Sequence, residues 1–394
     1  MRVLFSTSPM HGHFFPMVPL AWALQSAGHE VLVSAVRNFQ PVVEEAGLLP
    51  VGWLPAVEVP SFMFTDRSGA PVVPPRDPAG RIAAAGRTWG RYAAMVLESV
   101  LETCQTLRPD LVIAEPCDYA AGMAAARLGL PWAEHGWGFV GLSEYRPSAA
   151  VELAGELAGL GLPDLPSPDL AVDVWDPDPK RVHTPRTTRI RYLPYNGMSI
   201  DPGLPPPRPD RARICLTFGS NLPRYGHARF SPMLHATATA LAATGADLVV
   251  AVAKELTKDW APLPDSARVV SWLPLSMVVP DCAALVHHGG AGGTFVALLN
   301  GVPQLVIPQT ADQFANAEHV RRLGAGRLLP AAQATPERIA AECAELLTDN
   351  RYRVAALAAA EHNRAAPLPG DIVPELEELA ATVASAARTA TSTL

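Results

Sequence analysis

The 394-residue chain is 49% hydrophobic and 18% charged, and its formal net charge is −7. This composition excludes a chain kept disordered by its charge, and the length suits two domains of about 190 residues each. Because the chain has no Lys/Arg block and no run of about 18 apolar residues, we expect neither nucleic acid nor a membrane as a partner.

Cysteine usage and the first residues indicate the compartment. The cysteines are five in number, scattered, and never in C-x-x-C spacing. This disfavours a disulfide framework and a zinc site and is typical of a cytoplasmic protein. The first 16 residues carry one Arg and a short apolar stretch broken by His and Pro, which predicts a strand rather than a signal peptide.

The chain opens with the pattern of a βαβ unit. Arg2–Ser6 is a short apolar run that predicts a strand, and a helix is expected to begin near Pro16 and to end at Gly28. The apolar residues of this helix recur with helical spacing at Met17, Leu20, Ala21 and Leu24. A second strand at Glu30–Ala35 completes the unit, so we expect a parallel sheet.

The rest of the chain continues the α/β alternation. Further strands are expected at Leu111–Ala114, Arg213–Phe218, Leu248–Val252, Ala284–His287 and Gln304–Ile307. Half of the residues from Asp201 to Asp210 are proline, which excludes a helix or a central strand and predicts a stiff linker. We therefore expect one domain at residues 1–200, a linker at 201–212 and a second domain at 213–370.

Pro-rich loops with aromatic residues crowd the first half, at residues 52–78, which hold Phe62 and Phe64, and at residues 161–185. Such loops either connect elements at the surface or line a pocket for an apolar ligand above a rigid sheet. The sequence leaves both readings open.

The most informative stretch runs from Cys282 to Pro308. A short apolar strand ends at His287 and His288, and the segment GGAGGT then leads into a helix. Glycines let the backbone approach a ligand closely, and the unpaired N–H groups and dipole of a helix start favour an anion. We therefore expect a pyrophosphate site, with His288 suited to donate to a phosphate oxygen.

The same stretch excludes two common nucleotide motifs. It lacks G-x-x-x-x-G-K-[ST], and Phe295 stands where the last glycine of G-x-G-x-x-G would be. The first βαβ unit has neither this fingerprint nor an acid after its second strand to hold a ribose. A nicotinamide or flavin dinucleotide is therefore disfavoured, and we expect no cofactor.

Three separated motifs follow one another in the chain: SPMHGHFFPMVPLAWALQSAGHEV, VVSWLPLSMVVPDCAALVHH, and HHGGAGGTFVALLNGVPQLVIPQTADQFANAEHVRRLGAG. Together they resemble family 1 glycosyltransferases of the GT-B fold, above all bacterial enzymes that decorate polyketides and enediynes. The resemblance runs from Met1 to about Leu329 and is densest over residues 268–329. It implies two Rossmann-like domains facing a cleft, with the acceptor bound mainly in the first and the nucleotide sugar in the second. It also implies a final helix, residues 371–388, that crosses back to the first domain.

The resemblance assigns His13 as the general base that takes a proton from the acceptor hydroxyl. An imidazole with a pKa near 6.5 suits that task, although a His in this loop can also simply cap a helix. Glu115, just past a predicted strand, would orient the ring and stabilise the imidazolium. Asp118 is the rival for this role, and either acid could instead cap a helix.

The resemblance also assigns the donor site. The diphosphate would bind His288, Gly290, Gly292, Gly293 and Thr294, with Gly219 and Ser220 near the distal phosphate and Trp272 and Leu273 near the base. Fixed donors there stabilise charge on the leaving group, so no metal is expected. Each position also has a plain structural alternative, such as a tight turn or a core tryptophan.

Two further groups complete the expected site. Asp312 and Gln313 would bind donor-sugar hydroxyls, although Thr310-x-x-Gln313 also fits a capping box before a helix at Phe314–Leu323. The acceptor pocket would include Trp132, His135, Trp137, Phe62 and Phe64, some of which can equally be core.

We therefore expect an inverting, metal-independent glycosyltransferase that moves a sugar, preferably a deoxysugar, from a TDP-sugar to a hydroxyl of a hydrophobic natural-product acceptor. A UDP-sugar donor, transfer to carbon or nitrogen, a helper protein and a homodimer all stay open. One rival is a sugar-nucleotide epimerase of the same fold, which would convert the donor with no acceptor present. The other is a non-catalytic partner protein, which would need neither His13 nor the Asp312–Gln313 pair.

Overall fold

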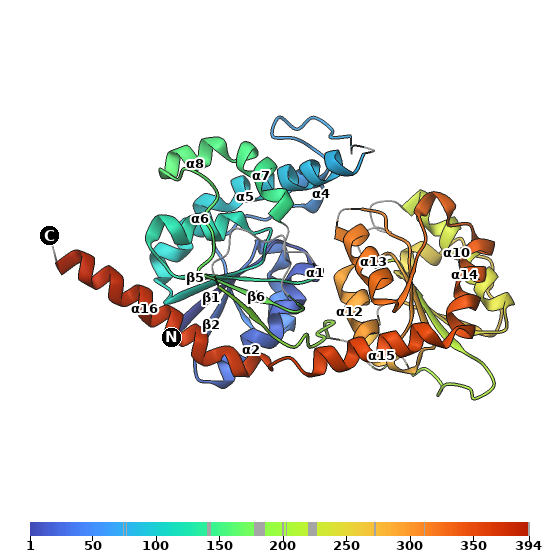
Figure 1. Cartoon of the computed structure of the whole chain (residues 1–394). Coiled ribbons are helices and arrows are strands. Elements are labelled where there is room, and N and C mark those ends of the chain that lie inside the picture. Colours follow the sequence, from blue (N-terminus) through green and yellow to red (C-terminus); the bar gives the residue numbers. More distant parts are fainter. Residues whose placement is uncertain are drawn as a thin grey trace. The chain divides into compact units, whose positions relative to one another are not determined.

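The computed structural model describes residues 1–73, 75, 77–139, 143–176, 186–198, 201, 203–219, 227–271, 273–310 and 312–392 (Figure 1). The chain forms two compact units, one of Met1–Tyr195 with Ala366–Leu394 and one of Asn196–Ala365. None of the helices in the described ranges is both long enough and apolar enough to cross a membrane.

The first unit is built on a seven-stranded parallel sheet in the order β3-β2-β1-β4-β5-β6-β7. Its strands are β1 Arg2–Ser6, β2 Glu30–Ser34, β3 Leu49–Val51, β4 Leu111–Ala114, β5 Trp132–His135, β6 Leu170–Asp173 and β7 Thr187–Arg189. The central strands are short and almost fully buried, as expected where helices cover both faces of a parallel sheet. The predicted strands at Arg2, Glu30 and Leu111 are confirmed to within one residue.

The helices of the first unit follow the strands. They are α1 His11–Phe14, α2 Val18–Ser26, α3 Gln40–Glu45, α4 Val59–Met63, α5 Pro78–Leu107, α6 Tyr119–Leu128, α7 Arg146–Glu152 and α8 Ala154–Leu160, with 3₁₀ turns at Phe15–Met17, Arg37–Phe39 and Ser143–Tyr145. The long α5 begins at an Asp77 cap, whose carboxylate accepts from the Gly80 N–H over 2.7 Å. It packs along α6 and α7.

The chain returns to the first unit at its end. After the 3₁₀ turn Pro369–Ile372, α16 Val373–Ser392 begins against this unit, and its C-terminal end projects away from it (Figure 1). An ion pair of 3.1 Å joins Glu375 to Arg186, and Oε1 of Glu377 lies 3.1 Å from Nε2 of His29. The N–H of Arg191 donates to the Pro367 carbonyl. The expected final helix is therefore present and belongs to the first unit.

The second unit has a six-stranded parallel sheet in the order β10-β9-β8-β11-β12-β13. Its strands are β8 Arg213–Thr217, β9 Asp247–Ala251, β10 Ala267–Val270, β11 Ala284–His287, β12 Gln304–Val306 and β13 Gly326–Leu328. Its helices are α10 His227–Ala243, α11 Leu275–Val278, α12 Ala291–Leu299, α13 Asp312–Leu323, α14 Pro336–Thr348 and α15 Asn350–Arg364, with 3₁₀ turns at Lys254–Thr257, Val279–Asp281 and Ala331–Gln333. Apolar residues of β8, β9, α10 and α14 form its largest core.

Both sheets share one topology, because each first strand has the second strand on one side and the fourth on the other. Ligands of doubly wound sheets bind outside the carboxyl ends of the strands at the point where the strand order reverses. That point lies between β1 and β4 in the first unit and between β8 and β11 in the second. The segments after these four strands are therefore the first places to look for a site.

Candidate active site

His13 lies beyond the carboxyl end of β1, in the short helix α1. Backbone hydrogen bonds from the N–H groups of Met10 and His13, to the carbonyls of Ser8 and Met10, fold the loop back on itself. Only 9% of His13 is exposed. The imidazole is therefore fixed by the loop and its surroundings.

Glu115 follows β4 and meets His13 at the reversal point of the sheet. Oε1 of Glu115 lies 3.1 Å from Nδ1 of His13, and the Ser8 hydroxyl donates to the same oxygen over 2.7 Å. A carboxylate only accepts hydrogen bonds, so Nδ1 of His13 carries the proton that points toward it. Nε2 is then the unprotonated nitrogen, which is the one able to take a proton.

The Glu115 carboxylate is buried and surrounded by donors. Besides His13 and Ser8, the Cys117 N–H donates to Oε2 over 2.7 Å and the indole N–H of Trp137 over 3.2 Å. Burial alone would raise the pKa of Glu115. The charge of His13 and the hydrogen bonds from His13, Cys117 and Ser8 outweigh burial and hold this pKa below its ordinary value. Glu115 is therefore an anion that can stabilise a protonated His13.

Two indole rings contact the His13 imidazole. Trp137 stacks on it with ring centres 4.6 Å apart and a 25° tilt, and Trp89 of α5 lies at 4.8 Å. These two rings hold the plane of the imidazole from either contact. Trp137 was expected at an acceptor pocket, and the structure places it beside the proposed base.

Asp118 occupies a different position from Glu115. It caps α6 by accepting from the Ala121 N–H over 3.3 Å, and the Ser6 hydroxyl donates to its other oxygen over 2.6 Å. Burial, together with the nearby charge of Glu115, raises the pKa of Asp118 to about 7. The acid in contact with His13 is therefore Glu115, and Asp118 has the capping role that the sequence also allowed.

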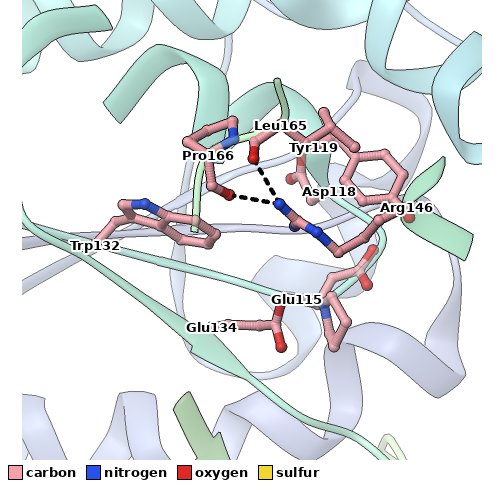
Figure 2. Close-up of a pocket in the computed structure, with 10 residues that line it drawn as sticks. Glu115, Asp118, Tyr119, Trp132, Glu134, Arg146, Leu165 and Pro166 are labelled. Atoms are coloured by element: carbon pink, nitrogen blue, oxygen red, sulfur yellow. Dashed lines mark hydrogen bonds between the residues drawn. The ribbon is translucent and has the colours of Figure 1, made fainter. Parts of the chain in front are cut away.

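A small pocket lies beside Glu115 and Asp118, and Trp132, Glu134 and Arg146 also line it (Figure 2). Arg146 donates to the carbonyls of Leu165 and Pro166 over 2.6 and 3.2 Å. The space that other atoms leave free accommodates about one water molecule. Trp132 therefore borders a small cavity beneath α6, and its position gives no support to an acceptor contact.

The remaining residues expected at the acceptor pocket differ in exposure. His135 is fully buried in β5, and burial lowers the pKa of its imidazole to about 4. Phe62 is also fully buried, packed against Trp89 and Tyr92. Phe64 is 42% exposed and is the one of the three that a ligand reaches without rearrangement of the fold.

One group of residues in the described ranges has the spacing of a metal site. Donor atoms of His13, Glu115 and Cys117 lie within 4.8 Å of one another. Nδ1 of His13 and Oε1 of Glu115 are also the two atoms that lie 3.1 Å apart in the contact between these side chains.

The glycine-rich segment lies at the reversal point of the second sheet. His288 and Gly289 follow β11, Gly290 is the N-cap of α12, and the Thr294 hydroxyl donates to the Gly290 carbonyl over 3.0 Å. The N–H of Thr294 also donates to the Gly290 carbonyl and is the first N–H group with a hydrogen bond inside the helix. The N–H groups of the four residues before Thr294 therefore have no partner within the helix, which is the arrangement that binds anions.

His288 packs between two glycines. A Cβ at Gly219 or at Gly290 would lie 2.6 Å from the His288 ring, so both positions require glycine for this approach, and Gly219 also has φ +70°. Burial lowers the pKa of His288 to about 4, so the imidazole is neutral at pH 7. Its Nδ1 is buried and has no hydrogen-bond partner within the described ranges.

Gly292 and Gly293 differ from each other in their surroundings. A Cβ at Gly293 would approach Nδ1 of His287 to 3.2 Å, whereas a Cβ at Gly292 would meet no atom within 4 Å. Nothing in the described fold therefore requires glycine at position 292. A ligand that closely approaches the backbone of α12 would require it.

Asp312 and Gln313 begin α13. Oε1 of Gln313 accepts from the N–H groups of Gln309 and Thr310 over 2.9 and 3.2 Å, so the side chain caps the helix as the sequence allowed. These two bonds use only the amide oxygen, so the N–H₂ group can still donate to a sugar hydroxyl. Leu273 is buried in a small core with Val278 and Val279, while Ser220 and Trp272 lie outside the described residues.

Two family models cover most of the chain. The N-terminal domain of the family described as erythromycin biosynthesis protein CIII-like matches residues 22–219, and the C-terminal domain matches residues 235–379. The chain belongs to this CIII-like family. The predicted resemblance to natural-product glycosyltransferases is thereby confirmed.

Individual relatives agree with the family assignment. The L-demethylnoviosyl transferase of Streptomyces niveus is 38% identical over 373 residues, with 94% of this chain and 96% of that protein covered. The solved structure of the Streptomyces sp. SF2575 glycosyltransferase SsfS6, complexed with thymidine diphosphate, is 34% identical with a TM-score of 0.82 over 96% of this chain and 99% of that one. The spinosyn rhamnosyltransferase SpnG, complexed with spinosyn aglycone, is 30% identical with a TM-score of 0.82 over 96% and 100%. These matches confirm the GT-B fold predicted from the sequence.

Sequence reasoning missed several residues around the site of this CIII-like chain. Ser8 and Trp89 contact Glu115 and His13, and their importance depends on which elements pack together. Gln304 and Asn316 bond to the glycine-rich segment from β12 and α13, whereas His287 bonds to Gly289 only two positions further along the chain. A contact between distant elements leaves no local pattern in one sequence, so a motif could indicate His287 but not the other two.

Proposed function

We propose that this chain is an inverting, metal-independent glycosyltransferase that acts in the cytoplasm. It transfers a deoxysugar from a TDP-sugar to a hydroxyl of a hydrophobic natural-product acceptor. The observation that carries the proposal is the buried His13–Glu115 pair, with 3.1 Å between Nδ1 and Oε1. The thymidine diphosphate complex of SsfS6, the aglycone complex of SpnG and the sugar named in the Streptomyces niveus relative support the choice of donor and acceptor.

His13 acts on the acceptor. Its Nε2 takes the proton of the acceptor hydroxyl as the oxygen attacks the anomeric carbon of the donor sugar. The bond from that carbon to the phosphate oxygen breaks on the opposite face, so the product has the inverted configuration. Glu115 lowers the barrier because its negative charge stabilises the imidazolium formed at that moment.

The glycine-rich segment acts on the leaving group. Negative charge builds on the diphosphate as the glycosidic bond breaks, and fixed N–H donors stabilise that charge without reorganising. The N–H groups of Gly290, Gly292 and Gly293 at the start of α12 and the neutral His288 supply such donors. A metal ion is not required for this step, so we expect that a chelator of divalent ions leaves the rate unchanged.

The test uses His13→Ala with a TDP-sugar and a panel of polyketide aglycones. A positioned general base contributes about 10²–10⁴-fold, so turnover should fall by that factor while TDP still raises the melting temperature. Full turnover in a variant that binds TDP would contradict the role of His13. The anomeric proton coupling of the wild-type product, measured by NMR, should show inversion.

A further assay separates transfer from epimerisation. The wild-type protein is incubated with the TDP-sugar alone, and the sugar configuration is followed by NMR. We expect no change at any sugar carbon in the absence of acceptor. Conversion of the donor under these conditions would replace the transferase proposal with an isomerase.

A further inference from the structure

A buried chain of hydrogen bonds fixes the start of the glycine-rich segment. Nδ1 of His287 accepts from the Gly289 N–H over 3.2 Å, and Nε2 lies 2.9 Å from Oε1 of Gln304. The amide nitrogen of Gln304 donates to the Thr294 carbonyl over 3.2 Å. All three bonds lie between β11, β12 and the first turn of α12.

These three hydrogen bonds allow only one arrangement of protons. The Thr294 carbonyl only accepts, so the amide N–H₂ of Gln304 faces it and the amide oxygen faces His287. Nε2 of His287 then carries the proton, and Nδ1 is the acceptor that the Gly289 N–H requires. Burial and the neighbouring His288 lower the pKa of His287 to about 3, so the ring stays neutral and the arrangement holds at physiological pH.

The other side of Gly289 is held from α13. Nδ2 of Asn316 donates to the Gly289 carbonyl over 2.8 Å and lies 3.4 Å from Oδ2 of Asp312, one helical turn earlier. Asn316 is fully buried. The same side chain therefore contacts both the glycine-rich segment and a residue proposed to bind the donor sugar.

Gly289 cannot move or be replaced within this arrangement. Its φ is +92°, and a Cβ there would lie 2.8 Å from Cγ1 of Val306 and 3.0 Å from the Gln313 carbonyl oxygen. The residue is thus enclosed between β12 and the start of α13. Hydrogen bonds to its N–H and its carbonyl fix the peptide groups on either side of it.

The bond from Asn316 sets the direction of a neighbouring donor. The Gly289 carbonyl and the Gly290 N–H belong to one trans peptide group and point in opposite directions. Because Asn316 holds the carbonyl, the Gly290 N–H must point away from Asn316. His287 meanwhile engages the Gly289 N–H, so that group is not available to a phosphate.

We propose that Asn316 and His287 are positioning residues that hold Gly289 from both sides and so aim the Gly290 N–H and the first turn of α12 at the donor diphosphate. This inference rests on the proposed function, because it assumes that the diphosphate binds there. It adds that the diphosphate and sugar subsites are coupled, since Asn316 belongs to the helix that begins with Asp312 and Gln313.

The first test is calorimetric binding of TDP, which has no sugar, to Asn316→Leu. Leucine keeps the side-chain volume and removes the donor, so the Gly289 carbonyl loses its partner. We expect TDP affinity to fall about tenfold or more. Ser231→Ala is the matched control, since it removes a buried hydrogen bond of 2.7 Å to the Leu256 carbonyl elsewhere in the same unit. It should bind TDP as the wild type does.

Steady-state kinetics separate positioning from loss of folded protein. With Asn316→Leu the KM for the donor should rise while the KM for the acceptor stays unchanged. A variant that is merely less folded would lower kcat alone. An unchanged donor KM together with unchanged TDP affinity would overturn the inference.

A second pair of variants keeps the test decisive if Asn316→Leu does not fold. His287→Asn keeps an acceptor close to the position of Nδ1, whereas His287→Leu has none. We expect the Asn variant to bind TDP several-fold more tightly than the Leu variant. Equal affinities would overturn the inference while leaving the proposed function intact. Failure of the wild type to bind TDP at all would instead refute the proposed function, and the inference with it.

Discussion

The two units place polar residues at the same point of the same sheet topology, yet the chemistry differs. Beyond β1 and β4, His13 is bonded to the buried anion Glu115. At the ends of β8 and β11, the hydrogen bonds that the described residues give to His287 and His288 include no carboxylate, and burial lowers the pKa of these two rings to about 3 and about 4. The two sites therefore differ in their histidines: His13 contacts a buried anion, whereas burial keeps the other two rings neutral at pH 7.

The largest expected effect comes from removing the carboxylate that makes His13 different. Glu115→Gln puts an amide N–H₂ in reach of Nδ1, which favours the tautomer with the proton on Nε2, where it blocks the base. We expect kcat to fall by about 10³-fold or more, as when the acid of a catalytic triad is replaced by its amide. TDP binding should not change, because Glu115 lies in the other unit.

The result is measured as kcat alongside calorimetric TDP affinity. Asp118→Asn is the control, since that acid bonds to Ser6 and Ala121 instead of His13. If both variants lost activity equally, the contact with His13 would not be what matters.

A smaller effect should separate two glycines of the other site. Gly292→Ala meets no atom of the described protein, and alanine in a helix is more stable than glycine by about 0.5–1 kcal/mol. We expect an unchanged or raised melting temperature with TDP affinity lowered about tenfold or more, because the methyl group fills space that the ligand needs. Gly290→Ala, whose Cβ would lie 2.6 Å from His288, should lower the melting temperature instead. Wild-type TDP affinity in Gly292→Ala would place the diphosphate elsewhere.

A further effect concerns pH and the second acid of the first unit. The pKa of Asp118 is raised from 3.8 to about 7, so the folded protein keeps a proton that the unfolded chain releases between pH 4 and 7. The free energy of unfolding therefore falls as pH rises through this range, by at most about 1.4 kcal/mol per pH unit, and this decline ends above pH 7. The contribution of Glu115 to the free energy of unfolding has the opposite sign, because the pKa of Glu115 is lowered in the fold. This contribution stabilises the fold at a pH above the ordinary pKa of a glutamate and is lost on acidification.

Asp118→Asn should remove the Asp118 contribution while preserving the helix cap. Urea unfolding of both proteins between pH 5 and 8 should therefore show the variant gaining stability over the wild type as pH rises. Parallel curves would indicate that Asp118 is ionised throughout and has no unusual pKa.

The sequence predicted the architecture well because short, fully buried strands are continuous apolar runs. Leu111–Ala114 and Ala284–His287 match the observed strands. The helix expected at Phe314 begins earlier, at Asp312, because the Gln313 N–H already bonds to the Thr310 carbonyl and closes a turn there. Backbone bonds at a helix end shift a boundary without altering the apolar pattern.

The site was predictable only where its residues are consecutive or follow a strand. His13, Glu115 and the glycine-rich segment follow strands, and a shared sheet edge brings the first two together. Trp89 lies on a long helix, and the bond from Asn316 to Gly289 spans 27 positions, so packing alone determines these contacts. Aromatic loop residues were least predictable, because Phe62 and Phe64 have similar surroundings in the sequence and opposite burial.

The most direct test of the account is thermal unfolding of the wild-type protein with TDP, UDP or NAD, each far above its expected dissociation constant. A ligand at 100 times that constant adds about 2.7 kcal/mol, which is readily seen as a higher melting temperature. We predict a clear shift with TDP, a smaller one with UDP and none with NAD, and a smaller TDP shift in Gly292→Ala than in the wild type. No shift with either nucleotide would mean that the glycine-rich segment is only structural, and it would contradict the transferase proposal.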